Sequence, residues 1–330
     1  MKFMTKLLGA TAAVALSAGA AAADPALIFD LGGKFDKSFN EAAWGGAERW
    51  AAETGGSYGE VELQSEAQRE QALRRFAEAG YSPIVANGFS FEGALREVAP
   101  DYPDTRFVIT DGGGGDLPNV QSAFFAAEQG SYIVGVMAAM ASNSGTVGFI
   151  GGMDLPFISD FGCGFVQGVH SVNPDAKILW NMTGVTPTAW NDPVKGAELT
   201  LAQISQGADV IYHAAGGTGE GVLQAAADNG VLGIGVDKNQ NGLHPGSVLT
   251  SMLKRVDNMV YDVFTAGNDV PTGFMTYDVA SGGIGYAMDE NNASLVSAEM
   301  AAAADAAAQG IVDGSIQVHL FSSDMSCPGL

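Results

Sequence analysis

The chain has 330 residues, 47% of them hydrophobic, and carries 37 acidic against 15 basic residues for a formal net charge of −22. Such a surface repels nucleic acids and anionic membranes, so we expect neither as a partner. A phosphorylated ligand is disfavoured unless its pocket is locally basic. The length suffices for two domains of about 100–200 residues each.

Residues 1–23 have the composition of a secretory signal peptide. Lys2 and Lys6 supply a positive start, residues 7–20 are apolar and rich in alanine, and residues 21–23 offer a small-residue cleavage site. No cysteine follows the apolar stretch to carry a lipid anchor. We therefore expect export, cleavage and a soluble chain whose net charge, without the two lysines, is −24. The alternative, a retained membrane anchor, needs an apolar span of roughly 20 residues.

The segment 27–46 predicts a ligand site at the end of a buried strand. Its apolar run at 27–29 ends in Asp30, and a glycine-containing loop then leads to a helix. In open α/β sheets, ligands bind in the crevice beyond the carboxyl ends of the strands. We therefore expect Asp30, Phe39 and Asn40 to lie in a cleft that recognises a small polar ring.

Apolar runs alternate with amphipathic stretches over most of the chain, a pattern typical of parallel sheets covered by helices. Glycine, asparagine, aspartate and proline separate the segments. Strands are predicted at 27–29, 60–63, 83–86, 106–110, 120–124, 146–150, 177–182, 209–213 and 232–236. Helices are predicted at 42–53, 66–79, 91–99, 130–141, 161–172, 193–206 and 221–229.

The two halves of the chain resemble each other. Residues 82–115 and 209–242 each predict a strand, a glycine-bearing loop, a helix and a second strand that ends in an aspartate. Asp111 and Asp237 are thus expected at corresponding strand ends of two similar lobes. Strand ends that face each other form a hinged cleft, a usual place for a small ligand. The alternative is that the two halves resemble each other only because all α/β sequences share this pattern.

Two cysteines are present, Cys163 and Cys327. In an oxidising compartment an even count favours pairing, and a bridge between them joins the C-terminal tail to the second domain. Two free thiols remain the alternative, because the sequence gives no distance. We expect no metal site and no cofactor, since there is no CxxC motif and the four histidines lack ligand spacing.

Seven motifs occur in order along residues 27–286: DKSFN (36–40), GFIGG (148–152), GF with a later glycine (164–168), WNDPVKG (190–196), AAGGTGEGV (214–222), IGVDKNQ (234–240) and LTSMLK (249–254). The series resembles the basic membrane protein family, the purine-nucleoside receptor type of ABC-transporter substrate-binding proteins. The resemblance implies a type I periplasmic-binding-protein fold, α/β throughout, with two doubly wound parallel-sheet lobes joined by a three-strand hinge. It divides the chain into a signal peptide (1–23), an N-terminal lobe (24–125 plus 251–281), a C-terminal lobe (126–250 plus 282–320) and a tail (321–330).

The resemblance also implies a ligand set. Phe39 and Trp190, one from each lobe, would enclose the base, and Trp190 replaces a more usual phenylalanine. Groups that match Asp30, Asn87 and Asp111 read the base edge in the family. Those that match Gly216, Asp237 and Lys254 hold the ribose.

The residue types suit these roles. Stacking on an aromatic face contributes on the order of 1–3 kcal/mol per base. Carboxylates accept N–H donors, and an asparagine both accepts and donates. Asp237 and Lys254 are expected to form a charge pair that orients two hydroxyls. The structural alternatives are core aromatics, aspartates that cap loops and a surface salt bridge. The glycine-rich segment 215–221 lacks the spacing of a dinucleotide fold or a P-loop.

We therefore expect a soluble periplasmic receptor, a monomer, that closes on a purine nucleoside and presents it to an ABC permease. The first alternative is a binding protein for a sugar or another small heterocycle such as a flavin precursor. A secreted nucleoside hydrolase is a second, and a signalling or chemoreceptor partner is a third. Catalysis is disfavoured because there is no GxSxG motif and no run of carboxylates suited to a metal.

Overall fold

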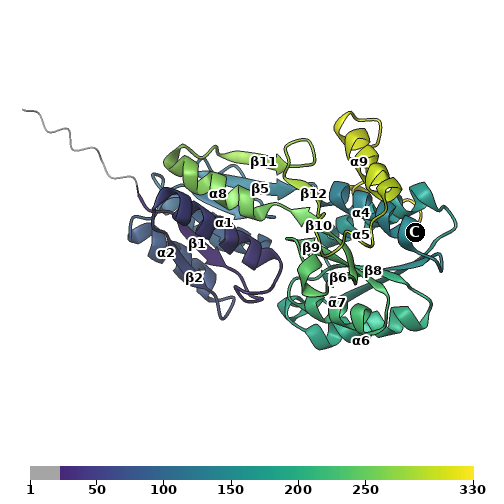
Figure 1. Cartoon of the computed structure of the whole chain (residues 1–330). Helices are drawn as coiled ribbons and strands as arrows, with labels where there is room; N and C mark the ends of the chain where they lie inside the picture. Colours follow the sequence, from purple (N-terminus) through teal and green to yellow (C-terminus); the bar gives the residue numbers. More distant parts are fainter. Residues whose placement is uncertain (1–22) are drawn as a thin grey trace, which may run out of the picture.

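Two α/β lobes, each built on a six-stranded sheet, make up the computed structural model (Figure 1). The structure describes residues 23–330. The predicted signal peptide therefore lies, up to residue 22, outside the described residues. None of the helices in the described part is long and apolar enough to cross a membrane.

The sheet of the first lobe is parallel throughout. Helices cover both of its faces, so its inner strands are buried on both sides and read as apolar runs. Its strands, in spatial order, are β11 (Gly273–Tyr277), β5 (Val120–Phe125), β4 (Phe107–Thr110), β3 (Ile84–Asn87), β1 (Ala26–Phe29) and β2 (Gly59–Glu62). Helices α1 (Phe39–Thr54) and α8 (Val256–Ala266) pack on one face, and α2 (Gln68–Glu78) and α3 (Glu92–Val98) on the other.

The second sheet is parallel except for its edge strand β12, which runs antiparallel to β10. Its strands, in spatial order, are β12 (Ile284–Tyr286), β10 (Val248–Lys254), β9 (Leu232–Asp237), β8 (Val210–Ala214), β6 (Thr146–Met153) and β7 (Lys177–Gly184). Helices α4 (Ala127–Ala141), α5 (Pro156–Val172) and α9 (Ala298–Val312) cover one face, and α6 (Pro193–Ser205) and α7 (Thr218–Asp228) the other. Short 3-10 helices include η1 (Phe89–Phe91), η2 (Ala99–Asp101), η3 (Pro187–Trp190), η4 (Asn241–Leu243) and η5 (Gly267–Asp269).

The chain passes between the lobes three times: between β5 and α4, between β10 and α8, and between β11 and β12. This is the predicted periplasmic-binding-protein architecture, with two lobes of largely parallel strands. The exact limits of the lobes stay a prediction. The prediction assigns residues 251–281 to the N-terminal lobe, whereas strand β10 pairs in the second sheet as far as Lys254.

Every strand and helix predicted between residues 27 and 236 is present in the structure. Some helices begin earlier than predicted: α1 at Phe39 instead of residue 42, and α5 at Pro156 instead of residue 161. Proline suits the first helical position because it has no N–H to satisfy. No element was predicted after residue 236, where the structure has β10, α8, β11, β12, α9 and the short α10 (Phe321–Asp324).

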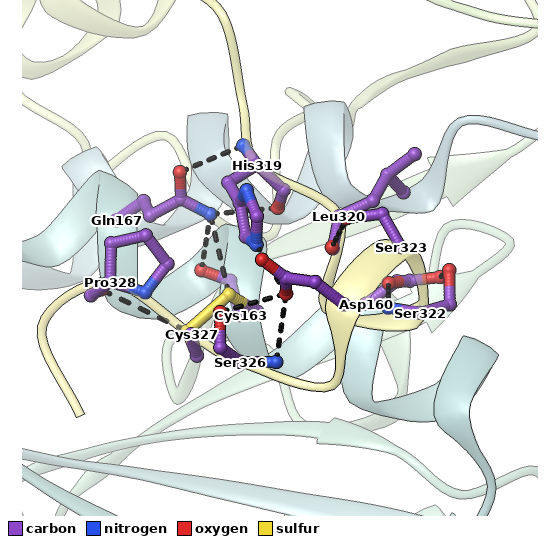
Figure 2. Close-up of a disulfide and its surroundings, with 11 residues drawn as sticks. Asp160, Cys163, Gln167, His319, Leu320, Ser322, Ser323, Ser326, Cys327 and Pro328 are labelled. Atoms are coloured by element: carbon purple, nitrogen blue, oxygen red, sulfur yellow. Dashed lines mark hydrogen bonds and ion pairs between the residues drawn. A yellow bond between two sulfur atoms is a disulfide. The ribbon is translucent and has the colours of Figure 1, made fainter.

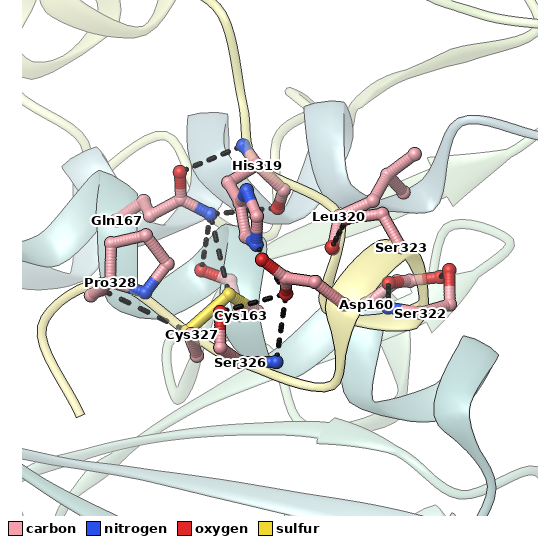
Figure 3. Close-up of polar contacts among 11 residues, drawn as sticks. Asp160, Cys163, Gln167, His319, Leu320, Ser322, Ser323, Ser326, Cys327 and Pro328 are labelled. Carbon is pink, nitrogen blue, oxygen red and sulfur yellow. Dashed lines mark hydrogen bonds and ion pairs between the residues drawn. A yellow bond between two sulfur atoms is a disulfide. The ribbon is translucent and has the colours of Figure 1, made fainter.

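The C-terminal tail is fastened to α5. The predicted disulfide between Cys163 and Cys327 is confirmed, and the two Cα atoms lie 5.5 Å apart (Figure 2). The Asp160 carboxylate accepts both the N–H and the hydroxyl of Ser322 at 2.8 Å (Figure 3). Gln167 exchanges two hydrogen bonds with the backbone of His319. One side of α5 is therefore fixed to the tail.

Candidate functional site

A cavity lies between the lobes, beyond the carboxyl ends of the parallel strands. It is lined by Asp30, Leu31, Gly32, Asp36, Phe39, Asn40, Asn87, Gly88, Phe89, Asp111, Phe157, Ile158, Phe161, Trp190, Ala214, Gly216, Val236, Asp237 and Lys254. The nine ligand residues named in the sequence analysis are all among them. The structure brings these residues together, and their roles toward a ligand remain predictions.

Asp30, at the end of β1, is held by a residue that the sequence analysis missed. Its Oδ1 accepts hydrogen bonds from Arg69 Nε at 3.1 Å and Nη2 at 2.9 Å, and its Oδ2 accepts one from the Ser90 hydroxyl. The Asp30 and Arg69 side chains are only 15% and 11% exposed. Arg69 thus neutralises and orients the carboxylate from behind the cavity wall. Helix α2 carries three arginines, and nothing in the sequence distinguishes Arg69 from the other two.

The Asn40 and Asn87 side chains form a pair whose orientation is fixed by carbonyl groups. Asn40 Nδ2 donates to the Gly33 carbonyl at 3.1 Å, so its Oδ1 faces Asn87 and accepts from Asn87 Nδ2 at 3.0 Å. Asn87 is fully buried, and its Oδ1 has no hydrogen-bond partner within residues 23–330. A buried acceptor without a partner is costly. A ligand N–H in this cavity would satisfy it.

Lys254 pairs with a different aspartate from the one predicted. Its Nζ donates to Asp111 of the first lobe, whereas Asp237 accepts from the Ser38 hydroxyl. The expected charge pair between Lys254 and Asp237 is therefore wrong. In the sheet register Leu253, not Lys254, lies opposite Asp237. Both side chains line the same cavity, and the charge of Lys254 opposes the rise in the pKa of Asp237 without an ion pair between the two.

Asp111 and Asp237 share an unusual backbone conformation. Both follow the apolar core of a strand and have positive φ angles, 59° and 67°. Aspartate is among the few non-glycine residues that tolerate this left-handed region. The shared geometry agrees with the predicted correspondence between the two lobes. Gly216, which follows β8, is also left-handed, with φ 55° beside the Trp190 carbonyl.

Aromatic side chains of both lobes line the cavity. Trp190 ends η3, and its indole lies over Gly152, where a Cβ would be only 2.1 Å from the indole Cζ3. Phe39 begins α1 in the opposite lobe and contacts the Lys254 ammonium, whose Nζ is 4.7 Å from the ring centroid. Both rings are partly buried and line the same cavity. This placement is compatible with a flat ligand between them.

Three further aromatic residues were missed. Phe89 of η1 and Phe157 of α5 bring the lobes together, with ring centroids 5.1 Å apart, and Phe161 lines the cavity one turn further along α5. Pro156 was the feature of the sequence that could have revealed Phe157 and Phe161, because α5 begins at this proline. Recognising it as a helix start would have placed Phe157 and Phe161 on one helical face.

Acceptors dominate the polar part of the cavity. The lining contains four aspartates and one lysine. Burial raises the pKa of Asp36 to about 7, although its carboxylate accepts the backbone N–H groups of Ser38, Asn40 and Glu41 at 2.9–3.1 Å. Burial also raises the pKa of Asp237, and the charge of Lys254 opposes this rise. Such a site favours ligands that carry N–H and O–H donors.

A cavity between two hinged α/β lobes, walled by aromatics and polar acceptors, defines a solute-binding protein. Similarities to known proteins agree with this class. A family model described as "ABC transporter substrate-binding protein PnrA-like" (Bmp) matches residues 25–319. The chain therefore belongs to the Bmp family of ABC transporter substrate-binding proteins. This family comprises binding proteins and not enzymes, so the hydrolase alternative falls away.

Relatives span nearly the whole chain. The chain is 32% identical over 318 residues to the ABC transporter nucleoside-binding protein BmpA of Lactococcus lactis, covering 89% of this chain and 88% of that protein. It is 34% identical over 317 residues to a CD4+ T-cell-stimulating antigen of Listeria monocytogenes, with 89% and 87% covered. An ABC transporter solute-binding protein from Aeropyrum pernix superposes with a TM-score of 0.80 at 26% identity, with 90% and 93% covered.

Proposed function

We propose that this protein binds a purine nucleoside between its lobes and presents it to the permease of an ABC importer. Family membership supplies the transport class. The observation that supports the ligand is the fully buried Asn87 Oδ1, which has no hydrogen-bond partner among the residues that the structure describes and lies in a cavity walled by aromatic rings. The similarity to a relative described as nucleoside-binding supports it.

The polar groups of the cavity form two sets. Asp30, Asn87 and Asp111 come from the strand ends of the first lobe, where they would read the N–H donors on the edge of the base. Gly216, Asp237 and Lys254 come from the second lobe, where they would bind the ribose hydroxyls. Phe39 and Trp190 would enclose the ring between them. A nucleoside has this division into a flat ring with an N–H edge and a separate hydroxyl-bearing part, and a simple sugar does not.

The charges of the site oppose a phosphorylated ligand. Lys254 is paired with Asp111, and Arg69 behind the wall is paired with Asp30. Among the described residues that line the cavity, a 5′-phosphate would therefore meet aspartates and no unpaired cation. We infer that nucleosides bind and nucleotides do not.

We extend the proposal to the location of the protein. The chain is exported with its signal peptide removed, and it acts as a soluble periplasmic monomer without a lipid anchor. N-terminal sequencing of the exported chain, with Asp24 as the expected first residue, checks the cleavage.

Titration calorimetry with guanosine, inosine, adenosine, uridine, ribose and riboflavin tests the ligand class. Purine nucleosides should give saturable heat at one site per chain, because they present N–H donors to Asn87 and a flat face to the aromatic walls. Guanosine 5′-monophosphate should bind much more weakly. Binding of ribose or riboflavin, without any nucleoside, would contradict the proposal.

Replacing Trp190 tests the aromatic enclosure. Trp190→Ala should weaken nucleoside affinity at least about tenfold, since stacking on one aromatic face contributes on the order of 1–3 kcal/mol. Phe274→Ala is the control, because Phe274 is 69% exposed on β11 and lies outside the cavity lining. Both variants should keep the wild-type melting temperature within a few degrees. An unchanged affinity in Trp190→Ala would remove the enclosure.

A further inference from the structure

Direct contacts join the two lobes beside the ligand cavity. They connect residues 37–41, which span the start of α1 in the first lobe, to residues 237–240 at the end of β9 in the second. Gln240 Nε2 donates to the Lys37 carbonyl at 2.8 Å, and Lys238 Nζ donates to Glu41 Oε1 at 2.7 Å. The Ser38 hydroxyl donates to Asp237. The latch comprises Lys37, Glu41, Lys238 and Gln240.

The latch is separable from the ligand site. Phe39, Asn40 and Asp237, which lie in the same two segments, line the cavity, but the four latch residues do not. Each lobe therefore presents side chains whose partners are in the other lobe and whose contacts do not include the ligand.

Each half of the latch is held rigid within its own lobe. On the first lobe, Asp36 accepts three backbone N–H groups and fixes the start of α1. On the second, Gln240 Oε1 accepts the Val236 N–H at 2.9 Å, and the Gln240 backbone N–H donates to the Ser251 hydroxyl at 2.9 Å. Preformed surfaces lose little conformational freedom when they meet. The amide of Gln240 therefore faces the Lys37 carbonyl without further ordering.

The ionic part of the latch is partly shielded from solvent, since the side chains of Lys238 and Lys37 are 35% and 42% exposed. The Glu41 side chain is 12% exposed and contacts two ammonium groups, Lys238 at 2.7 Å and Lys37 at 3.2 Å. Partial burial raises the pKa of Glu41, but the hydrogen bonds and charges of Lys238 and Lys37 outweigh burial and leave the pKa lowered. Glu41 is thus ionised at neutral pH while the lobes are in contact. A shielded pair of this kind contributes more than an exposed one.

We propose that the latch formed by Lys37, Glu41, Lys238 and Gln240 holds the lobes closed over the cavity, independently of what the cavity binds. The latch increases the closed fraction of the ligand-free protein and slows ligand release. It acts on the open–closed equilibrium and not on ligand contacts. This goes beyond the proposed nucleoside function and does not require it.

Fluorescence energy transfer between the lobes tests the latch without any ligand. The exposed positions Gln71 in α2 and Ala202 in α6 are changed to cysteine and labelled, since Cys163 and Cys327 are already joined. Lys238→Met should lower the closing equilibrium constant about three- to fivefold, the upper range for a single ion pair. Glu41→Gln should do the same, and the double variant should add little, because both changes remove one contact.

Lys195→Met is the matched control. Lys195 is also in the second lobe, but its partner Glu198 lies on the same helix at 3.6 Å, so this change should leave the inter-lobe distances at wild-type values. With the ligand identified by calorimetry, Lys238→Met should also release it about three- to fivefold faster than Lys195→Met does.

Identical inter-lobe distance distributions in Lys238→Met, Glu41→Gln and Lys195→Met would overturn the latch. That result is read from the ligand-free protein, so it says nothing about the ligand. Conversely, a lack of nucleoside binding by the wild type would overturn the proposed function and leave the latch test intact. The two failures are therefore distinguishable.

Discussion

At the scale of single residues, Glu128 shows how burial couples the fold to pH. It lies in the first turn of α4, is 7% exposed and faces the charges of Asp160 and Asp278. Burial raises the pKa of Glu128 from its ordinary value of 4.5 to about 7, and the two aspartates add to the rise. The folded protein therefore binds a proton here more tightly than the unfolded chain does between these two pH values.

Glu128→Gln should flatten the dependence of stability on pH. A carboxyl whose folded pKa is raised stabilises the fold fully below pH 4.5, and this contribution is lost as the pH rises to about 7. Urea unfolding at steps from pH 4.5 to 7.5 should show a smaller fall in stability for the variant. Burial lowers the pKa of His213 to about 4, so this residue makes stability rise with pH, and it does so equally in the wild type and the variant. An unchanged slope would contradict the assignment.

Residue-level prediction succeeded where a residue follows a strand and failed where its partner is distant in sequence. Strand ends and motifs placed Asp30, Asn87 and Asp111 at one cavity. Arg69 was missed because its role depends on how α2 packs against β1. The predicted partner of Lys254 was wrong because the actual partner, Asp111, belongs to the other lobe. How two lobes close on each other does not follow from the local sequence of either lobe.

At the scale of elements, α5 links the cavity to the C-terminal tail. Its first turns carry Phe157 and Phe161, which line the cavity, and its next turns carry Cys163 and Gln167, which hold the tail. Close packing against α4 fixes the helix independently: a Cβ at Gly168 would lie 2.0 Å from the Tyr132 carbonyl oxygen. The tail therefore adds stability to an element that already has a fixed position.

Cys327→Ser should lower stability more than ligand affinity. The bond spans 164 residues, and a cross-link over a long loop contributes typically about 2–4 kcal/mol by restricting the unfolded chain. We expect a lower melting temperature and faster amide exchange in residues 317–330, with nucleoside affinity within about twofold of wild type. Reduction of the wild-type disulfide is the parallel measurement and should give the same result. Slow exchange in the tail of the variant would show that its hydrogen bonds suffice.

Elements up to residue 236 were predictable because each lobe repeats strand, helix and strand in a regular order. After that point the chain serves both lobes alternately: β10 completes the second sheet, β11 the first, and β12 the second again. Strand β12 has only three residues, and α9 is so rich in alanine that it shows little contrast between its faces. Periodicity therefore carries little information in this part.

At the scale of the whole molecule, the charge of −22 is a source of self-repulsion. Salt should therefore stabilise the protein: the melting temperature should rise steadily between 0.05 and 0.5 M sodium chloride, because the screening length falls to about 10 Å near 0.1 M. Choline chloride at the same ionic strength should give the same rise, which separates screening from the binding of a particular cation. A fall in melting temperature would mean that local ion pairs outweigh the overall repulsion.

The architecture of the whole molecule was predictable from the duplicated pattern and the series of motifs, since both constrain two lobes with facing strand ends. The contacts between the two lobes were not predictable, because they depend on the angle at which the lobes meet.

The left-handed aspartates affect how future mutagenesis should be read. Alanine at position 111 or 237 removes a carboxylate and also forces a poorly suited residue into a positive φ, at a cost of roughly 1 kcal/mol. Any loss of affinity would then mix chemistry with backbone distortion. Asparagine accepts the same torsion and keeps the side-chain shape, so it alone isolates the effect of the negative charge.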